Sequence, residues 1–258
     1  MLELRRHLNT LHALIIRDLM VRFGRHHLGF IWTILEPMLL CAGVMLLWSM
    51  LREPVIHGMP LAAFVLTGYM PLTLWRHLQA PMTRILRGNA SLLYHRPVSH
   101  AHIMLARGFL EFFSTSAALM VIYFVVTTTG VVEPVADPGL ALAAWLSAGW
   151  YFAAGGMLIG AWTEYWEPAE KFIQPAMYLQ LPLSGAFFMV DWMPAYAQKL
   201  LLLNPAVHCW EMFRAGFFGD AITTHYDPVY LAFASAATTA LAAAAIYHVR
   251  DHIQTTGV

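Results

Sequence analysis

Residues 138–163 read PGLALAAWLSAGWYFAAGGMLIGAWT, a stretch that contains no aspartate, glutamate, lysine or arginine. In a helix, about 20 such residues cross the roughly 30 Å hydrocarbon core of a lipid bilayer. A soluble protein of this size would instead need a charged, mixed surface along most of its length. The stretch therefore predicts a transmembrane helix over about 139–163.

The same absence of charge recurs along most of the chain, in residues 37–51, 54–75, 112–132, 172–190 and 228–249. Of the 258 residues, 59% are hydrophobic and 12% are charged, whereas soluble domains have about 25% charged residues. We therefore predict an all-α, multi-pass membrane protein. Its six expected transmembrane helices cover about 29–51, 61–80, 103–129, 139–163, 172–190 and 228–249.

The first segment of the chain has the pattern of an amphipathic helix. Its apolar side chains recur at spacings of three and four residues, and they are Leu4, Leu8, Leu11, Ile15, Leu19 and Phe23. The arginines of this segment fall mostly off that stripe. Such a helix lies in the membrane interface, with arginines at the headgroups and leucines at the acyl boundary.

The basic residues give the expected orientation. With the N-terminus in the cytoplasm, twelve lysines and arginines lie in inner segments and three in outer segments, which follows the positive-inside rule. We expect three parts: an interfacial helix over residues 1–28, a transmembrane domain over residues 29–250 and a tail over residues 251–258. Both termini are then cytoplasmic.

Residues 191–227, before the last predicted span, are too many for a turn and too few for two further crossings. They are rich in leucine, tryptophan and phenylalanine, and Asn204-Pro205 divides them into two short helical pieces. One interpretation is a re-entrant helix pair in the outer leaflet, which would bury these apolar side chains. The other is an amphipathic loop on the membrane surface.

Several kinds of chemistry are excluded or disfavoured. The sequence GxxxxGK[ST] is absent, so the chain does not bind ATP through a P-loop, and we expect no cofactor on it. The histidines show neither HExxH nor zinc spacing, and a formal net charge of zero does not favour nucleic acid. A serine hydrolase built from Ser184 and His208 would lack the GxSxG motif. A membrane enzyme and an ATP-independent channel or scaffold remain the alternatives to a transporter.

Three stretches carry a resemblance to a known family. Residues 15–37 read IIRDLMVRFGRHHLGFIWTILEP, residues 92–98 read LLYHRPV, and residues 204–214 read NPAVHCWEMFR. In this order and with these gaps, the chain resembles the membrane subunit of bacterial type-2 ABC exporters for capsular polysaccharide. Exporters of O-antigen and teichoic acid share this architecture and are the alternative.

The resemblance implies a set of partners and a place in the cell. It implies a homodimer in the bacterial inner membrane with two separate cytoplasmic ATPase subunits, which would hold the ATP and Mg. It also implies a lipid-linked, often acidic polysaccharide as the substrate. Periplasmic and outer-membrane polysaccharide export proteins would receive the polymer.

The resemblance also assigns the contact with the ATPase to the inner loop over residues 81–102, where the family has a coupling helix. The candidate residues of this loop are Arg84, Arg87, Tyr94, His95 and Arg96. A smaller contact is expected at Glu167 and Glu170, next to Glu164 and Lys171. The alternative is a loop whose arginines only follow the positive-inside rule.

The glycan pathway is expected where the first and fifth spans border the dimer interface, as the resemblance implies. Sugar C–H faces stack on aromatic rings, which selects Trp32, Trp48, Tyr178, Phe187 and Phe188. Glu36 either faces a cavity or forms a salt bridge that tethers the N-terminal helix. Arg52 and Arg214 are expected to offer positive charge to a polyanion at the outer mouth, unless Arg214 pairs with Glu211.

Overall fold

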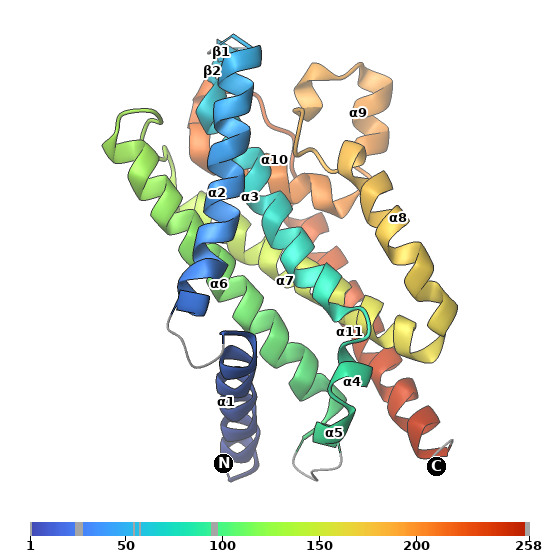
Figure 1. Ribbon diagram of the computed structural model, residues 1–258. Coiled ribbons are helices and arrows are strands. Elements are labelled where there is room, and N and C mark those ends of the chain that lie inside the picture. The colour runs from blue at the N-terminus through green and yellow to red at the C-terminus, as the bar shows by residue number, and fades with distance from the viewer. Residues whose placement is uncertain (1, 24–27, 54, 57, 94–97, 256–258) are drawn as a thin grey trace.

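The computed structural model describes residues 2–23, 28–53, 55–56, 58–93 and 98–255, and within these ranges it is almost entirely helical (Figure 1). Its one sheet there is a hairpin of β1 (Val55–Ile56) and β2 (Met59–Pro60), paired antiparallel. The helices are α1 (Leu2–Phe23), α2 (Leu28–Leu51), α3 (Leu61–Gln79), α4 (Ile85–Gly88), α5 (Ala90–Leu93), α6 (His100–Thr128), α7 (Pro138–Tyr165), α8 (Glu170–Gln180), α9 (Ala195–Leu201), α10 (Pro205–Phe218) and α11 (Pro228–Thr255).

Four of these helices are long and apolar enough to cross a membrane: α2 (over Ile34–Leu51), α6, α7 and α11 (over Pro228–Val249). The predicted first four spans agree with α2, α3, α6 and α7 to within three residues at each end. α3 is less apolar because Arg76 and His77 lie in its last turn. α11 continues to Thr255, beyond the predicted boundary at residue 250, because neither glycine nor proline interrupts the sequence there.

The fifth predicted span is not one continuous helix. α8 ends at Gln180, so its 11 residues rise about 16 Å, roughly half of the hydrocarbon core. A 3-10 turn over Leu181–Leu183 and a bent loop follow, and Gly185 has a φ of 88°. The prediction of a single helix over 172–190 is therefore wrong, because Pro182 donates no backbone hydrogen bond and Gly185 takes a left-handed conformation.

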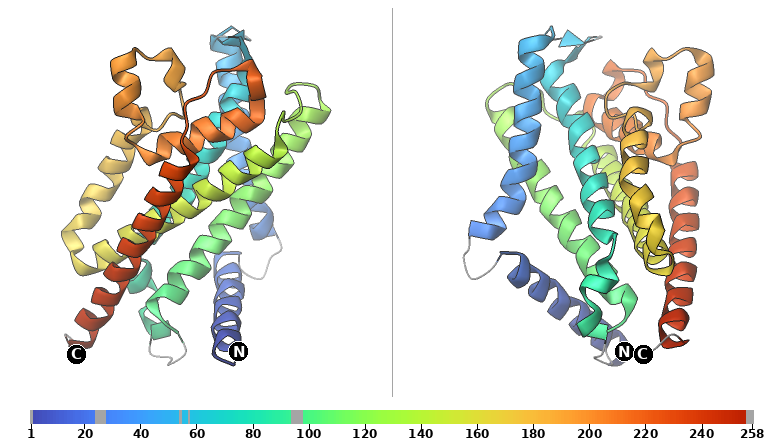
Figure 2. Two further views of the ribbon diagram at one scale, coloured as in Figure 1. Left: turned by 180° about the vertical axis from the view of Figure 1, so that it is seen from behind. Right: turned by 45° about the vertical axis from the view of Figure 1, so that its right-hand side comes forward.

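The core of the bundle is built around α7, which packs against α3, α10 and α11. The view from behind shows α11 beside α7 (Figure 2, left). Glycines allow these close approaches: a methyl group on Gly156 would overlap the carbonyl oxygen of Leu78 on α3, and one on Gly216 of α10 would overlap the backbone of Ala141. Small residues at helix interfaces are typical of membrane bundles.

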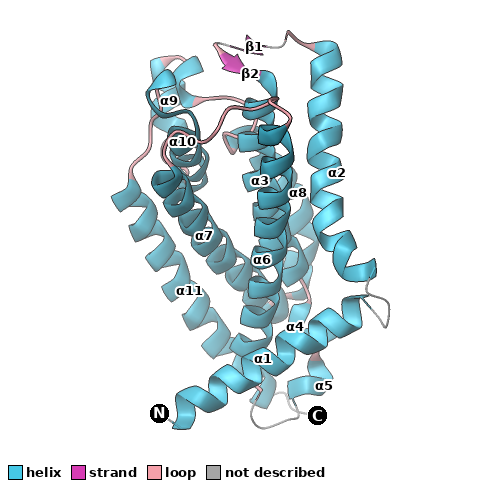
Figure 3. Ribbon diagram, turned by 90° about the vertical axis from the view of Figure 1, so that its left-hand side faces the viewer, coloured by secondary structure: helices cyan, strands magenta, loops and turns pink. Residues whose placement is uncertain are grey.

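The N-terminal helix α1 packs against α6 through Leu14, with Leu11 and Ile15 partly buried beside it. Leu4 and Leu8, from the same predicted stripe, are 64% and 56% exposed. α2 stands at the edge of the bundle, against α3 and α6, with most of its apolar side chains exposed (Figure 3). α1 and the end of α11 lie at one end of the bundle, the terminal end, and the β1–β2 hairpin lies at the opposite end, the hairpin end.

Candidate functional site

At the terminal end, salt bridges join the two segments that the sequence assigned to the ATPase contact. The Arg84 guanidinium contacts the Glu170 carboxylate, and Arg87 lies 3.3 Å from Glu167 and 3.6 Å from Glu164. The bond to Glu170 raises the pKa of Arg84 above its usual value. These five residues, the terminal-end ion network, link the loop after α3 to the turn between α7 and α8.

Tyr94, His95 and Arg96 lie outside the described residues, so their place in the contact stays a prediction. The leucines before them, Leu92 and Leu93 of α5, are partly buried against the core formed by α1, α4 and α6. A packing role for these leucines is therefore enough to explain their presence in the loop.

One residue that fixes this end was not predicted from the sequence. Arg17 of α1 donates a hydrogen bond of 2.7 Å to the side-chain oxygen of Asn89, which itself donates to the carbonyl of Ile85. The bond ties α1 to the segment that carries Arg84 and Arg87. Arg17 gave no separate signal because it belongs to a run of N-terminal arginines that the positive-inside rule already explains.

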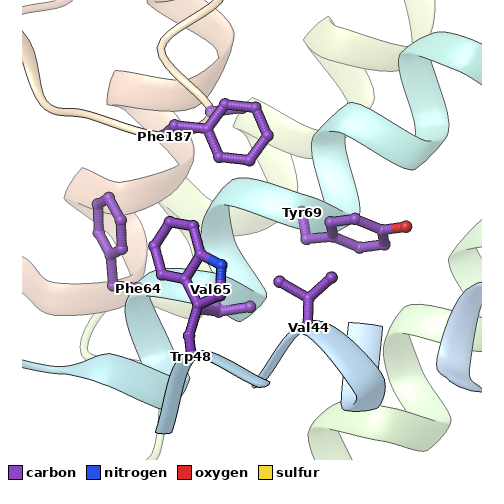
Figure 4. A pocket seen from close by; sticks show the side chains of 7 residues that line it. Val44, Trp48, Phe64, Val65, Tyr69 and Phe187 are labelled. Atoms are coloured by element: carbon purple, nitrogen blue, oxygen red, sulfur yellow. The ribbon is translucent and has the colours of Figure 1, made fainter. Parts of the chain in front are cut away.

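At the hairpin end, aromatic side chains from three segments surround a small cavity of about 10 Å³ (Figure 4). Its lining residues are Val44, Trp48, Phe64, Val65, Tyr69, Ala186 and Phe187, and we call it the aromatic pocket. The ring centroids of Trp48 and Phe187 are 6.3 Å apart, and the Arg52 guanidinium lies 4.4 Å from the centroid of the Trp48 ring. A cavity of this size has room for about one water molecule.

The structure therefore brings three of the eight predicted pathway residues together: Trp48, Phe187 and Arg52. Trp32 lies about four turns and Glu36 about three turns before Trp48 on α2, and both are exposed. Tyr178 is 65% exposed on α8, outside the pocket lining. Phe188 is half-buried and adjoins the pocket through the backbone of its loop.

Two aromatic residues of the pocket, Phe64 and Tyr69, were not identified from the sequence. Both belong to α3, to which no pathway role was assigned. In the sequence, nothing distinguishes these two residues, five positions apart on one helix, from aromatic residues that face lipid. Only the position of α3 beside α2 and the loop after α8 reveals them.

Arg214 does not lie at an outer mouth, so the expectation that it offers charge there is corrected. Its side chain is fully buried, and the guanidinium donates bonds of 2.7 Å to the carbonyls of Gly185 and Phe188 and of 2.9 Å to that of Ala186. It also lies 4.6 Å from the centroid of the Phe64 ring. α10 is buried between α3 and α7, which turns this position inward.

Glu211, the alternative partner of Arg214, also binds backbone groups. Its carboxylate accepts hydrogen bonds from the N–H groups of Val190, at 3.0 Å, and His225, at 2.9 Å. Asn204 caps α10 by accepting a bond from Ala206 N–H, which confirms the predicted break at Asn204-Pro205. The segments before and after α10 are thus bonded to it.

The geometry argues against a serine hydrolase. The Ser184 hydroxyl donates to the carbonyl of Leu181 at 2.8 Å. Both ring nitrogens of His208 contact backbone groups, the carbonyl of Leu202 and the N–H of Asp227, each at 2.9 Å. A catalytic base would instead need a free nitrogen directed at the serine. Among the described residues, no group of three metal-ligating side chains comes together either.

Comparisons with known proteins agree with this geometry. Residues 9–218 match the family model of the ABC-2 type transporter. The capsule polysaccharide export inner-membrane protein CtrC of Neisseria meningitidis serogroup A is 36% identical over 85% of this chain and 83% of its own length. BexB of Haemophilus influenzae, with the same description, is 32% identical over 84% of this chain and 82% of its own.

A more distant relative is the polysialic acid transport protein KpsM of Escherichia coli, which is 24% identical over 84% of this chain and 86% of its own length. The family model covers most of the chain, from within α1 to the end of α10. The chain therefore belongs to the ABC-2 type transporter family, as a multi-pass membrane subunit homologous to the inner-membrane proteins of capsule polysaccharide export.

Proposed function

We propose that this chain forms the membrane pathway of an ATP-driven exporter of lipid-linked capsular polysaccharide in the bacterial inner membrane. The observation that carries the proposal is its 36% identity to a capsule polysaccharide export protein over 85% of the chain. The polysialic acid transport protein, although more distant, is also described by the transport of an acidic polysaccharide. These relatives favour capsule over O-antigen or teichoic acid as the substrate.

We propose six membrane crossings, made by α2, α3, α6, α7, α8 with its following loop, and α11. Both termini then lie in the cytoplasm, which the count of basic residues and the shared position of the termini support. The exposed Leu4 and Leu8 favour α1 in the membrane interface. α9 and α10 form the re-entrant pair in the outer leaflet, and α10 is buried there against protein.

The partners follow from two surfaces. Membrane subunits of this family are not catalytic themselves, so we propose two cytoplasmic ATPase subunits that hold the ATP and Mg. As the family resemblance implies, we propose a second copy of the chain against α2, which stands at the edge of the bundle. Periplasmic and outer-membrane export proteins would continue the pathway.

The terminal-end ion network is the proposed seat of the ATPase. Glu167 is 70% exposed and Arg84 is 63% exposed, so both charges are accessible to a partner. Because Arg87 bridges to Glu164 at the end of α7, a displacement of the loop would be transmitted to the central helix of the bundle. The network thus connects a partner surface with the membrane pathway.

Alanine at both Arg84 and Arg87 tests this seat. We expect the ATPase to co-purify with the variant in much lower yield, with Arg5→Ala on α1 as a control for a lost exposed arginine. Unchanged recovery of the ATPase, together with normal export, would contradict the proposed contact.

The aromatic pocket is the proposed start of the outer part of the glycan pathway. Its ring faces offer the surfaces on which sugars stack, and Arg52 adds positive charge beside Trp48. At about 10 Å³ it has no room for a sugar, so we propose that α2 separates from the loop after α8 during export.

Gene deletion with complementation tests the function. Without the chain, capsular polymer should disappear from the cell surface and accumulate inside the cell. Trp48→Ala and Phe187→Ala should complement poorly while still assembling with the ATPase, whereas Phe124→Ala, which removes a ring that is 67% exposed on α6, should complement fully. Normal surface polymer in both pocket variants would refute the pathway, and accumulation of a different glycan would refute the substrate.

A further inference from the structure

The loop after α8 leaves the helical hydrogen-bond pattern while it is still buried. Ser184, Gly185 and Ala186 have almost no exposed surface. Backbone carbonyls buried inside a membrane protein need donors, because each one left without a bond costs several kcal/mol. The Arg214 guanidinium supplies them, because it donates three hydrogen bonds, to the carbonyls of Gly185, Ala186 and Phe188. The broken fifth span therefore depends on a side chain from α10.

Arg214 is held firmly enough to act as a template. It projects from the buried helix α10, and its guanidinium lies against the Phe64 ring of α3. Gly68, four residues after Phe64 on α3, lets both the loop and the guanidinium approach this helix, because a methyl group there would overlap the carbonyl oxygen of Ala186 and lie 3.1 Å from Arg214 Nη2. The loop is thus clamped between α3 and Arg214. Lysine would not replace this arrangement, since it has one nitrogen in place of a planar fork.

The clamped loop carries Phe187, whose ring meets Trp48 in the aromatic pocket. We propose that Arg214 is a positioning residue: it holds residues 185–188 so that Phe187 closes the aromatic pocket against Trp48. This inference rests on the proposed role of that pocket in the glycan pathway. The charge of Arg214 acts on the backbone of its own chain and not on the polysaccharide.

Ser184→Cys gives a reporter of the loop. Its side chain is 1% exposed, and a thiol replaces a hydroxyl of similar size. N-ethylmaleimide should label this cysteine slowly in the purified complex. In the Arg214→Lys and Gly68→Ala backgrounds we expect labelling to be about tenfold faster, the ratio that corresponds to losing one charge-assisted hydrogen bond. Gly68→Ala retains the arginine and perturbs its contact with the Ala186 carbonyl sterically.

Two internal controls separate a local movement from general unfolding. The native Cys41 and Cys209 are both 0% exposed, so mass spectrometry of the labelled peptides should find them unmodified in every folded variant. Gly108→Ala is the matched glycine control, because the nearest atom to the added methyl group, Met82 Cε, lies at an ordinary contact distance of 3.7 Å. Its labelling at Ser184→Cys should equal that of the parent.

The outcomes are distinct. Fast labelling at position 184 in both variants, with Cys41 and Cys209 protected, supports Arg214 as the positioning residue. Unchanged labelling in variants that assemble, or labelling of all three cysteines alike, overturns it. Export is measured on the same variants: if position 184 becomes reactive while surface polymer stays normal, the positioning holds and the pathway role proposed for the pocket fails.

Discussion

Replacement of Glu111 should destabilise the chain more than replacement of Glu111 and Arg107 together. The two side chains lie four residues apart on α6, with Arg107 Nη2 and Glu111 Oε1 separated by 2.9 Å. Glu111 is 1% exposed and Arg107 is 23% exposed. His77 of α3 adds a second, longer contact of 3.9 Å to the same carboxylate. A spacing of four residues places both side chains on one face of the helix, which allows this pairing.

The magnitude follows from this burial. Removing one partner of a fully buried ion pair costs about 3–5 kcal/mol, because the other charge is left without compensation. Arg107 keeps some access to solvent or headgroups, so we expect about 2–3 kcal/mol for Glu111→Met. Replacing both residues with methionine removes both desolvation costs, and the double variant should lose less than about 1 kcal/mol.

The assay is the apparent melting temperature of the detergent-solubilised chain, followed by its loss from the monodisperse peak in size-exclusion chromatography. For Glu111→Met we expect a decrease of about 5 °C. Arg107→Met completes the double-mutant cycle, and in that variant the Glu111 carboxylate keeps its 3.9 Å contact with His77. A double variant that melts at or below the Glu111→Met temperature would refute the reasoning.

Two further predictions concern packing and capping. Gly156→Ala should lower the melting temperature by several degrees, because the methyl group overlaps the carbonyl oxygen of Leu78. Gly43→Ala should leave the melting temperature unchanged, because nothing lies within 4 Å of its methyl group. Equal melting temperatures of the two variants would contradict the close approach of α3 and α7. Asn204→Ala should lower the free energy of unfolding by about 1 kcal/mol, because the cap on Ala206 N–H is lost, and Asn204→Asp should retain most of this stability. The same thermal assay tests both variants, and an unchanged melting temperature of the alanine variant would contradict the cap.

Helix bounds were predictable from the sequence where a local signal marks the end. α7 begins at Pro138, directly after Asp137, whose carboxylate caps the helix by accepting from Leu140 N–H at 3.0 Å. The bounds of α2, α3 and α6 were predicted in the same way, from uncharged stretches that end at charged residues or prolines. These signals are local because helix formation depends on the segment's own residues and on the lipid around them.

The site was less predictable, because tertiary packing decides it. The apolar content of residues 172–190 suggests one continuous helix, although Pro182 and Gly185 are local signals of its break after Gln180. The sequence does not show that the carbonyls of this loop are bonded by Arg214, far along the chain. The inward direction of Arg214 depends on α3 and α7, which cover α10. The charge pattern predicted that Arg84 and Glu170 both lie on the inner side of the membrane. Their contact, however, depends on how two separate loops pack together.

The central position of α7 has a consequence for how the chain assembles during synthesis. The helices α3 and α6, which contact α7, precede it in the chain, whereas α10 and α11 are translated later. α7 therefore enters the membrane before two of its main neighbours exist, and lipid must cover the part of its small-residue face that they later bury. A chain that stops before residue 205 would keep this face open to other helices. Correct assembly thus depends on the last quarter of the sequence arriving before a wrong partner does.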